Sequence, residues 1–233
     1  MNLGPTVNTP SNEGGPNLSS DGHRLYFNSN RPGGFGGNDL YVSRRHNKRD
    51  DFGWQPAVNL GAGVNSAAGE SNAADFEDDV TGILTLYFAS NRPGGLGMDD
   101  IYASTLQPDG TFGPAELVVE LSSVSNDRQP AIRRDGLEMF LASDRLGSFG
   151  AGAQGLDIWV STRASTSDPW SPPVNLGPVV NTTLIDAGPA LSFDGTTLYF
   201  QSTRPGGLGP CPNPLGPCVF DLWVTTRSKL HGH

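Results

Sequence analysis

Short stretches of alternating apolar and polar residues run along the whole chain, separated by turns rich in glycine and proline. Alternation with a period of two is typical of a strand with one buried face. No segment shows the period of about 3.6 residues that marks an amphipathic helix. The pattern therefore predicts an all-β protein, with its most aromatic strands at RLYFNS (24–29), TLYFAS (85–90), EMFLAS (138–143) and TLYFQS (197–202).

These stretches belong to a repeat that covers the chain of 233 residues. Each copy has a first apolar run, a turn (Asp-Gly in three copies), the aromatic stretch, a loop rich in glycine, a third run and a short fourth run. Asp-Gly between two such runs is a strong hairpin signal. Four strands in a unit of about 58 residues are typical of a propeller blade. The first run is anchored at Pro16, Ala73, Pro130 and Pro189.

The sequence thus predicts a four-bladed β-propeller with four antiparallel strands in each blade. We expect one domain over 1–228, followed by a tail or tag remnant at 229–233. The chain opens with MNLGPTVN, the phrase of a fourth strand, and ends after a third strand. The N-terminal strand is therefore expected to complete the last blade and close the ring. The expected repeats are 8–65, 66–122, 123–181, and 182–228 together with 1–7.

The charge of the chain narrows the range of partners. A formal net charge of −9 argues against a nucleic-acid backbone or an anionic membrane surface as the main partner. The basic stretch RRHNKR (44–49) is expected to be a solvated loop between strands. No apolar run is long enough to span a bilayer, and the first residues lack the basic start and apolar stretch of a signal peptide.

Two cysteines, Cys211 and Cys218, lie in the Pro/Gly-rich segment CPNPLGPC. We expect them to form a small disulfide ring, although a reduced pair is the alternative. A structural zinc site is not expected, because it needs four ligands and no other cysteine is present. A disulfide indicates a periplasmic or secreted protein, whose signal peptide would lie outside this sequence.

The loop between the second and third strands carries a recurring arginine, a run of glycines and, at the start of the third strand, an aspartate. The arginine and this aspartate (Asp39, Asp100, Asp157, Asp221) are expected to pair and hold the loop closed. A device present in every blade is a scaffold rather than a site, so we expect the arginines to be structural rather than ligand-binding. A phosphate cradle is not expected, because the loop joins two strands and opens no helix. The arginines are Arg31, Arg92, Arg145 and Arg204.

A second recurring acid stands three residues before the anchor of each first run. In a propeller the first strands line the central tunnel, so these acids are expected to approach the axis at one mouth. Four converging carboxylates suit a hard cation, with Ca²⁺ the first choice. The alternative is that the acids cap loops or pair with the arginines. The candidate axial ring is Glu13, Glu70, Asp127 and Asp186.

The phrases LSSDGHRLYFNSNRPGG (18–34) and LSFDGTTLYFQSTRPGG (191–207) resemble the WD40-like repeat of TolB-type propellers. The resemblance covers essentially the whole chain, and it implies a propeller in the bacterial envelope or a secreted module. The Tol-system protein has six blades and a separate N-terminal domain, whereas this sequence has four repeats and no such domain. Its partner, a peptidoglycan-associated lipoprotein, is therefore not carried over.

The sequence is compatible with two functions from different classes. The first is a binding or scaffold propeller that recognises a protein, peptide or glycan on the face carrying the inter-strand loops. The second is a Ca²⁺-dependent hydrolase of the lactonase or esterase type on the same face, with a carboxylate as base. His23 and His46 belong to no recognisable triad, so we expect no histidine-based site. The insertions AGAQ (151–154) and CPNPLGPC (211–218) mark the loops that break the fourfold pattern.

Overall fold

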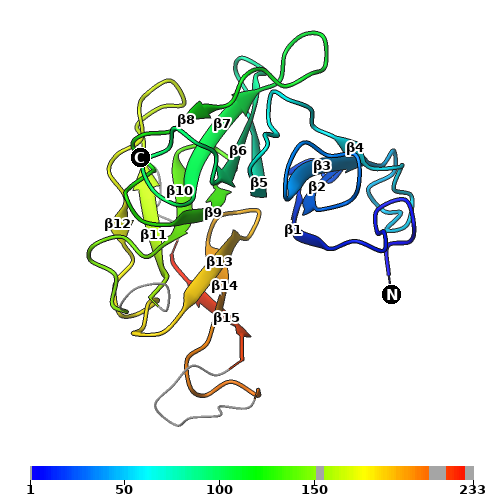
Figure 1. Cartoon of the computed structure of the whole chain (residues 1–233). Helices are drawn as coiled ribbons and strands as arrows, with labels where there is room; N and C mark the ends of the chain where they lie inside the picture. Colours follow the sequence, from blue (N-terminus) through cyan, green and yellow to red (C-terminus); the bar gives the residue numbers. More distant parts are fainter. Residues whose placement is uncertain (1, 151–154, 210–218, 229–233) are drawn as a thin grey trace. The chain divides into compact units, whose positions relative to one another are not determined.

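The computed structural model describes residues 2–150, 155–209 and 219–228, and all its regular elements are β-strands (Figure 1). The all-β prediction is confirmed. Two compact units divide the chain, Met1–Val119 and Glu120–His233. Each unit holds two antiparallel sheets, and each sheet corresponds to one of the repeats. We call each of these sheets a blade, numbered 1 to 4 along the chain.

The first unit contains blades 1 and 2, in which each strand pairs with the next one along the chain. The first strand of each blade has a bulge against the second, and the fourth strand is only two residues long. Blade 1 is formed by β1 (Glu13–Leu18), β2 (Arg24–Ser29), β3 (Asp39–Arg44) and β4 (Val58–Asn59); blade 2 by β5 (Glu70–Glu77), β6 (Leu84–Ser90), β7 (Asp100–Thr105) and β8 (Glu116–Leu117).

The second unit contains blades 3 and 4 with the same order of strands. Among the described residues blade 4 has three strands, and β15 has no fourth strand beside it. Closure of the ring by the N-terminal strand therefore stays a prediction. Blade 3 is formed by β9 (Asp127–Ile132), β10 (Glu138–Ser143), β11 (Asp157–Thr162) and β12 (Val174–Asn175); blade 4 by β13 (Asp186–Leu191), β14 (Thr197–Ser202) and β15 (Asp221–Thr226).

The hairpin turn between the first and second strands forms where the sequence predicted it. In blade 1 the Asp21 carboxylate accepts hydrogen bonds from the Ser19 hydroxyl and from the backbone N–H of His23. Gly22 has φ +76°, a conformation that costs glycine little and that other residues avoid. Blade 2 departs from this pattern, because its turn is longer and is capped instead by Asp78.

Apolar faces of neighbouring blades pack together within each unit. In the first unit Tyr26 and Leu40 of blade 1 lie in one buried cluster with Leu86 and Phe88 of blade 2. In the second unit the equivalent cluster joins residues of both blades, among them Phe140, Ile158 and Phe200. The recurring aromatic positions of the second and third strands are therefore mainly core residues, as their fixed place in the repeat indicates.

Charged side chains also join neighbouring blades inside a unit. Arg24 of blade 1 lies 3.5 Å from the Asp75 carboxylate and 3.1 Å from that of Glu77, both in blade 2. Burial raises the pKa of Asp75 to about 6, against the opposing effect of the Arg24 charge. In the second unit Arg227 pairs with Glu138 of the neighbouring blade through both of its terminal nitrogens.

The raised pKa of Asp75 gives a pH dependence of stability with a definite sign. The folded state holds the proton more tightly than the unfolded chain, so this contribution is complete at low pH and is lost as the pH rises from about 4 through 6. We expect Asp75→Asn to gain stability relative to the wild type across that interval, by on the order of 2 kcal/mol. Urea unfolding at pH 4 and pH 7.5 measures the difference.

The matched control is Val80→Ala, which changes a largely exposed side chain in the neighbouring turn and removes no titratable group. Its stability difference from the wild type should change little between the two pH values. A pH-independent difference for Asp75→Asn would contradict the assignment of a raised pKa to this carboxyl group.

Candidate functional site

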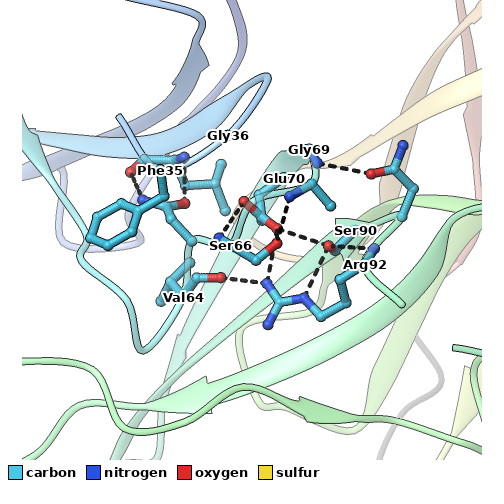
Figure 2. A network of polar contacts seen from close by, with 12 residues as sticks. Phe35, Gly36, Val64, Ser66, Gly69, Glu70, Ser90 and Arg92 are labelled. Carbon is cyan, nitrogen blue, oxygen red and sulfur yellow. Dashed lines mark hydrogen bonds and ion pairs between the residues drawn. The ribbon is translucent and has the colours of Figure 1, made fainter. Parts of the chain in front are cut away.

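The recurring arginine of the corner loop occupies the same place in all four blades. In blade 2 the Arg92 guanidinium donates to the carboxylate of Glu70, at 3.0 Å, and to the backbone carbonyl of Val64 (Figure 2). Its Nε also donates to the Ser90 hydroxyl at 3.1 Å, and its charge lies 4.7 Å from the centre of the Tyr102 ring. These contacts tie the start and end of a hairpin to the segment that enters the blade.

The acids at the start of the first strands are the partners of these arginines. The pairs are Arg31–Glu13, Arg92–Glu70, Arg145–Asp127 and Arg204–Asp186. The expected pairing of each arginine with the aspartate of the third strand is therefore wrong; the arginines meet the first-strand acids, which is the pairing given above as the alternative for those acids. In blade 1 the third-strand Asp39 instead accepts from loop N–H groups and from the Asn59 amide, whereas the Ser29 hydroxyl, to which Arg31 donates, itself donates to Glu13.

Both oxygens of each of these four carboxylates already accept hydrogen bonds within their own blade. In blade 2 one oxygen of Glu70 accepts from the Ser66 hydroxyl, Ser90 and Arg92, and the other from the Ser66 N–H. Burial acts to raise the pKa of Glu13, but hydrogen bonds from Thr9 and Ser29 and the charge of Arg31 outweigh it and lower that pKa. The hydrogen bonds of Asp127 and Asp186 follow the same pattern.

This arrangement supplies each acid with a cation from the protein itself. Among the residues that the structure describes, no three or more His, Cys, Asp or Glu side chains gather into a group that could hold a metal ion. The carboxylates are thus satisfied by arginine and hydroxyl donors, which is a poor fit to a shared cation. The axial Ca²⁺ stays a prediction.

The aspartate that opens the third strand fixes the backbone of the corner loop. Asp39 accepts from the N–H groups of Phe35, at 2.6 Å, and Gly36, at 3.2 Å. Asp100, Asp157 and Asp221 accept from loop N–H groups in the same manner. Burial raises the pKa of Asp157, opposed by the hydrogen bonds from Phe149 and Asn175. The loop is therefore closed by an aspartate, although not by a salt bridge.

Each corner loop presents an apolar side chain to solvent at, or next to, the residue whose N–H the aspartate binds. We call these four side chains the loop tips. Their signal in the sequence is the apolar residue that recurs after R-P-G-G, or after R-L-G-S in blade 3, and the predictions from sequence did not include it. The exposed fractions are 50% for Phe35, 47% for Leu96, 45% for Phe149 and 102% for Leu208.

The loop of blade 1 also rests against the entry of blade 2. The N–H of Gly37 donates to the carbonyl of Ala68 at 3.0 Å. A Cβ atom on Gly36 would lie 2.1 Å from that same carbonyl oxygen and 2.4 Å from the carbonyl oxygen of Ser66, so only glycine fits there. Figure 2 shows Phe35 and Gly36 close to the Glu70 network.

A second series of arginines, absent from the candidates predicted from sequence, holds the opposite end of the blade. Arg45, Arg163 and Arg227 each donate from Nε to the carbonyl of the hairpin glycine of their own blade. The Arg45 and Arg163 guanidinium groups lie over the rings of Trp54 and Trp170. These arginines follow the third strand in the repeat, so their recurrence was the available signal.

The remaining candidates from the sequence lie apart from the corner loops or cannot be placed. His23 and His46 belong to blade 1 at the end that holds Arg45, where His23 donates to the Arg45 carbonyl at 2.8 Å. The predicted disulfide Cys211–Cys218 and the insertion at 151–154 fall outside the described residues. Within the described ranges no helix is long and apolar enough to cross a membrane.

No protein-family model matches the sequence, and no curated protein matches it either. Solved structures do match. An α-L-arabinofuranosidase from Lactobacillus brevis superposes with a TM-score of 0.61 at 17% identity, over 92% of this chain and 72% of the other. TolB from Acinetobacter baumannii gives 0.57 at 14% identity, over 95% of this chain and 42% of the other. A xylan β-1,4-xylosidase from Bacillus halodurans gives 0.61 at 14%, over 93% and 41%.

The fold is that of a β-propeller. The likeness to TolB agrees with the resemblance seen in the repeat, although the chain spans less than half the length of TolB and of the xylosidase. Identities this low show the fold alone, and the propeller is shared here by sugar-cleaving enzymes and by TolB.

The arginine–carboxylate pair predicts a large loss of stability when one partner is removed. Arg92→Ala leaves the fully buried Glu70 carboxylate without its cation, and removing one partner of a buried pair costs about 3–5 kcal/mol. Denaturant unfolding measures the loss. Arg49→Ala, at an exposed arginine with no ion pair among the described residues, should cost less than about 0.5 kcal/mol. Equal losses in the two variants would contradict a structural role for Arg92.

Two adjacent glycines in the blade 1 loop offer a matched pair of substitutions. Gly36→Ala forces a methyl group into two backbone oxygens that cannot move aside, and we expect it to cost about 2–3 kcal/mol of stability. Gly37→Ala places its methyl group 3.9 Å from the nearest oxygen and should change stability by less than about 0.5 kcal/mol. Thermal unfolding of both variants tests this docking of the loop against blade 2.

Proposed function

We propose that this propeller is an extracytoplasmic binding module whose corner loops contact an apolar surface on a protein partner. The observation that carries the proposal is the set of loop tips, each a large apolar side chain that is about half exposed or more. Exposed apolar groups held in a fixed geometry are the usual means by which a surface gains affinity in water.

The corner loops support this proposal because their shape is set before any partner arrives. Asp39 binds the backbone N–H of Phe35 itself, and Asp100 does the same for Leu96. A tip that is already in place loses little conformational entropy when it is covered. The aspartate that recurs at the start of each third strand thus serves to hold the loop tip in an exposed position.

The kinds of residue at the loop tips favour a protein partner over a glycan or a nucleic acid. Two of the four tips are leucines, which provide apolar contact area but no flat ring on which a sugar stacks. Met98, with an exposed fraction of 70%, adds a flexible apolar side chain to the loop of blade 2. A nucleic acid is disfavoured by the net charge of −9.

The alternative function is hydrolysis, since some structural neighbours are sugar-cleaving enzymes. A hydrolase of the predicted kind needs a carboxylate that is free to act as base or to hold Ca²⁺. The recurring acids of the corners are engaged instead: one series pairs with arginines, and the other holds loop N–H groups. We therefore place binding before catalysis.

A periplasmic or secreted location belongs to the same proposal. Its support is the TolB-like repeat, the likeness to TolB structures and the pair Cys211 and Cys218, which an oxidising compartment would join.

Selection of binders from a displayed library of random 12-residue peptides tests the loop tips directly. Peptides enriched on the wild type should carry apolar residues and should lose at least about tenfold in affinity for a variant with serine at all four loop tips. A control variant with Val58→Ser, Val80→Ser and Val174→Ser removes exposed apolar groups elsewhere and should keep the affinity. Equal binding to the loop-tip variant would overturn the proposal.

A parallel assay separates binding from catalysis. Chromogenic arabinofuranosides, xylosides, esters and lactones should show no turnover above that of the buffer, with or without Ca²⁺ after treatment with EDTA. Turnover that requires Ca²⁺ and disappears on chelation would favour the hydrolase.

A further inference from the structure

Blade 1 carries an open pocket at the end opposite its corner loop, where the β1–β2 turn meets the β3–β4 connection. The pocket has a volume of about 270 Å³. Most of its charged lining is basic, although the chain as a whole is acidic. The lining residues are Asp21, His23, Arg24, Arg44, Arg45, His46 and Gln55.

Part of this lining is explained by the scaffold. Asp21 caps the hairpin turn, and Arg45 holds the turn glycine, as the corresponding arginines do in blades 3 and 4. Arg24 is balanced by three carboxylates, of which Asp75 and Glu77 come from blade 2. These three lining residues would be needed whether or not the pocket bound anything.

The other basic residues are not explained by the repeat. Where blade 1 has His23, blades 3 and 4 have Leu137 and Thr196. The position of Arg44 is threonine in each of the other blades, at Thr105, Thr162 and Thr226. The position of His46 is Gln107, Ala164 and Ser228. Three departures from the repeat thus meet in one pocket: one in the hairpin turn, one at the last residue of the third strand and one just after that strand.

The strand ladder places one of these departures beside another arginine. Arg44 lies directly opposite Arg24 across the β2–β3 pair, and like charges at such positions are unfavourable. The equivalent pairs are Thr85–Thr105, Glu138–Thr162 and Thr197–Thr226. Among the described residues Arg44 is exposed and has no ion pair or hydrogen-bond partner for its guanidinium. Three carboxylates already balance Arg24, so an external anion would supply the partner that Arg44 lacks.

The two histidines lie on the sides of the same pocket. His23 Nδ1 donates to the Arg45 carbonyl, so its Nε2 is an acceptor in the neutral ring and a donor in the charged ring. His46 Nε2 accepts from the Gln55 amide at 2.9 Å, which leaves its Nδ1 as the donor. The Arg45 guanidinium also faces the pocket, and within the described part of the chain the exposed carboxylate of Asp51 is its ion-pair partner. Arginine and histidine side chains around one concave site are the groups that bind phosphate and sulfate oxygens.

We propose that this pocket binds the oxyanion group of a small ligand, a phosphate or sulfate carried by a molecule the size of a sugar. The Arg44 guanidinium supplies the principal charge, and the histidines fix the orientation. The volume lies just below the range of about 300–1,000 Å³ that drug-sized ligands occupy, so a monosaccharide phosphate fits and a polymer would extend out of the pocket. The site is independent of the corner loop of blade 1, which lies at the other end of the blade.

Isothermal titration calorimetry with the full chain tests the proposal. The probes are inorganic phosphate, inorganic sulfate, glucose 6-phosphate, glucose 6-sulfate and glucose. We expect the two esters to bind, the inorganic ions to bind more weakly and glucose to show no binding. Binding by inorganic ions alone would overturn the ester assignment and reduce the site to a simple ion site. Binding by none of the four anions at about 10 mM would overturn the whole proposal.

Variants that restore the repeat residues are expected to keep the fold and to lose the site. Arg44→Thr alone should weaken ester binding by at least about tenfold, and the triple variant His23→Thr, Arg44→Thr, His46→Gln should abolish it. Arg49→Ser removes a positive charge from the same loop without touching the pocket, so its affinity should stay within about twofold. Equal weakening by Arg44→Thr and Arg49→Ser, or full binding by the folded triple variant, would overturn the proposal.

Discussion

The structure of every blade depends on one interaction, the pairing of a corner-loop arginine with a carboxylate at the start of the first strand. In blades 2, 3 and 4 this carboxylate is completely buried, and the arginine also reaches a carbonyl of the segment that enters the blade. A buried charge is tolerated only when it is paired and hydrogen-bonded. The pair therefore fixes where each blade begins and how its loop leaves the second strand.

Because this interaction uses the acids and the arginines, little charged chemistry remains free at the corner loops. Their outward parts are apolar, held by the aspartate that binds the loop backbone at Phe35, Leu96 and Phe149. The opposite end of blade 1 has the reverse character, with a basic pocket around Arg44. A single scaffold thus separates apolar contact from anion recognition by placing them at the two ends of its strands.

A repeated scaffold also makes function easier to locate. Residues that recur, such as Arg45 and Arg163, are explained by contacts that recur with them. Residues that depart from the repeat and still meet in space need another explanation, and His23, Arg44 and His46 are of this kind.

The sequence by itself determined the all-β class, the four repeats and the Asp-Gly hairpins, because periodicity and turn chemistry are local properties. It could not decide which acid Arg31 meets, since Glu13 and Asp39 are both near in the repeat and the choice depends on the side of the loop to which the arginine turns. Nor could the sequence place His23 beside Arg44 and His46. His23 precedes β2, whereas Arg44 ends β3 and His46 follows it, and only the pairing of β2 with β3 brings these residues together. Contacts between segments distant in sequence are set by the register of strands and the burial of charge, and those only the folded chain decides.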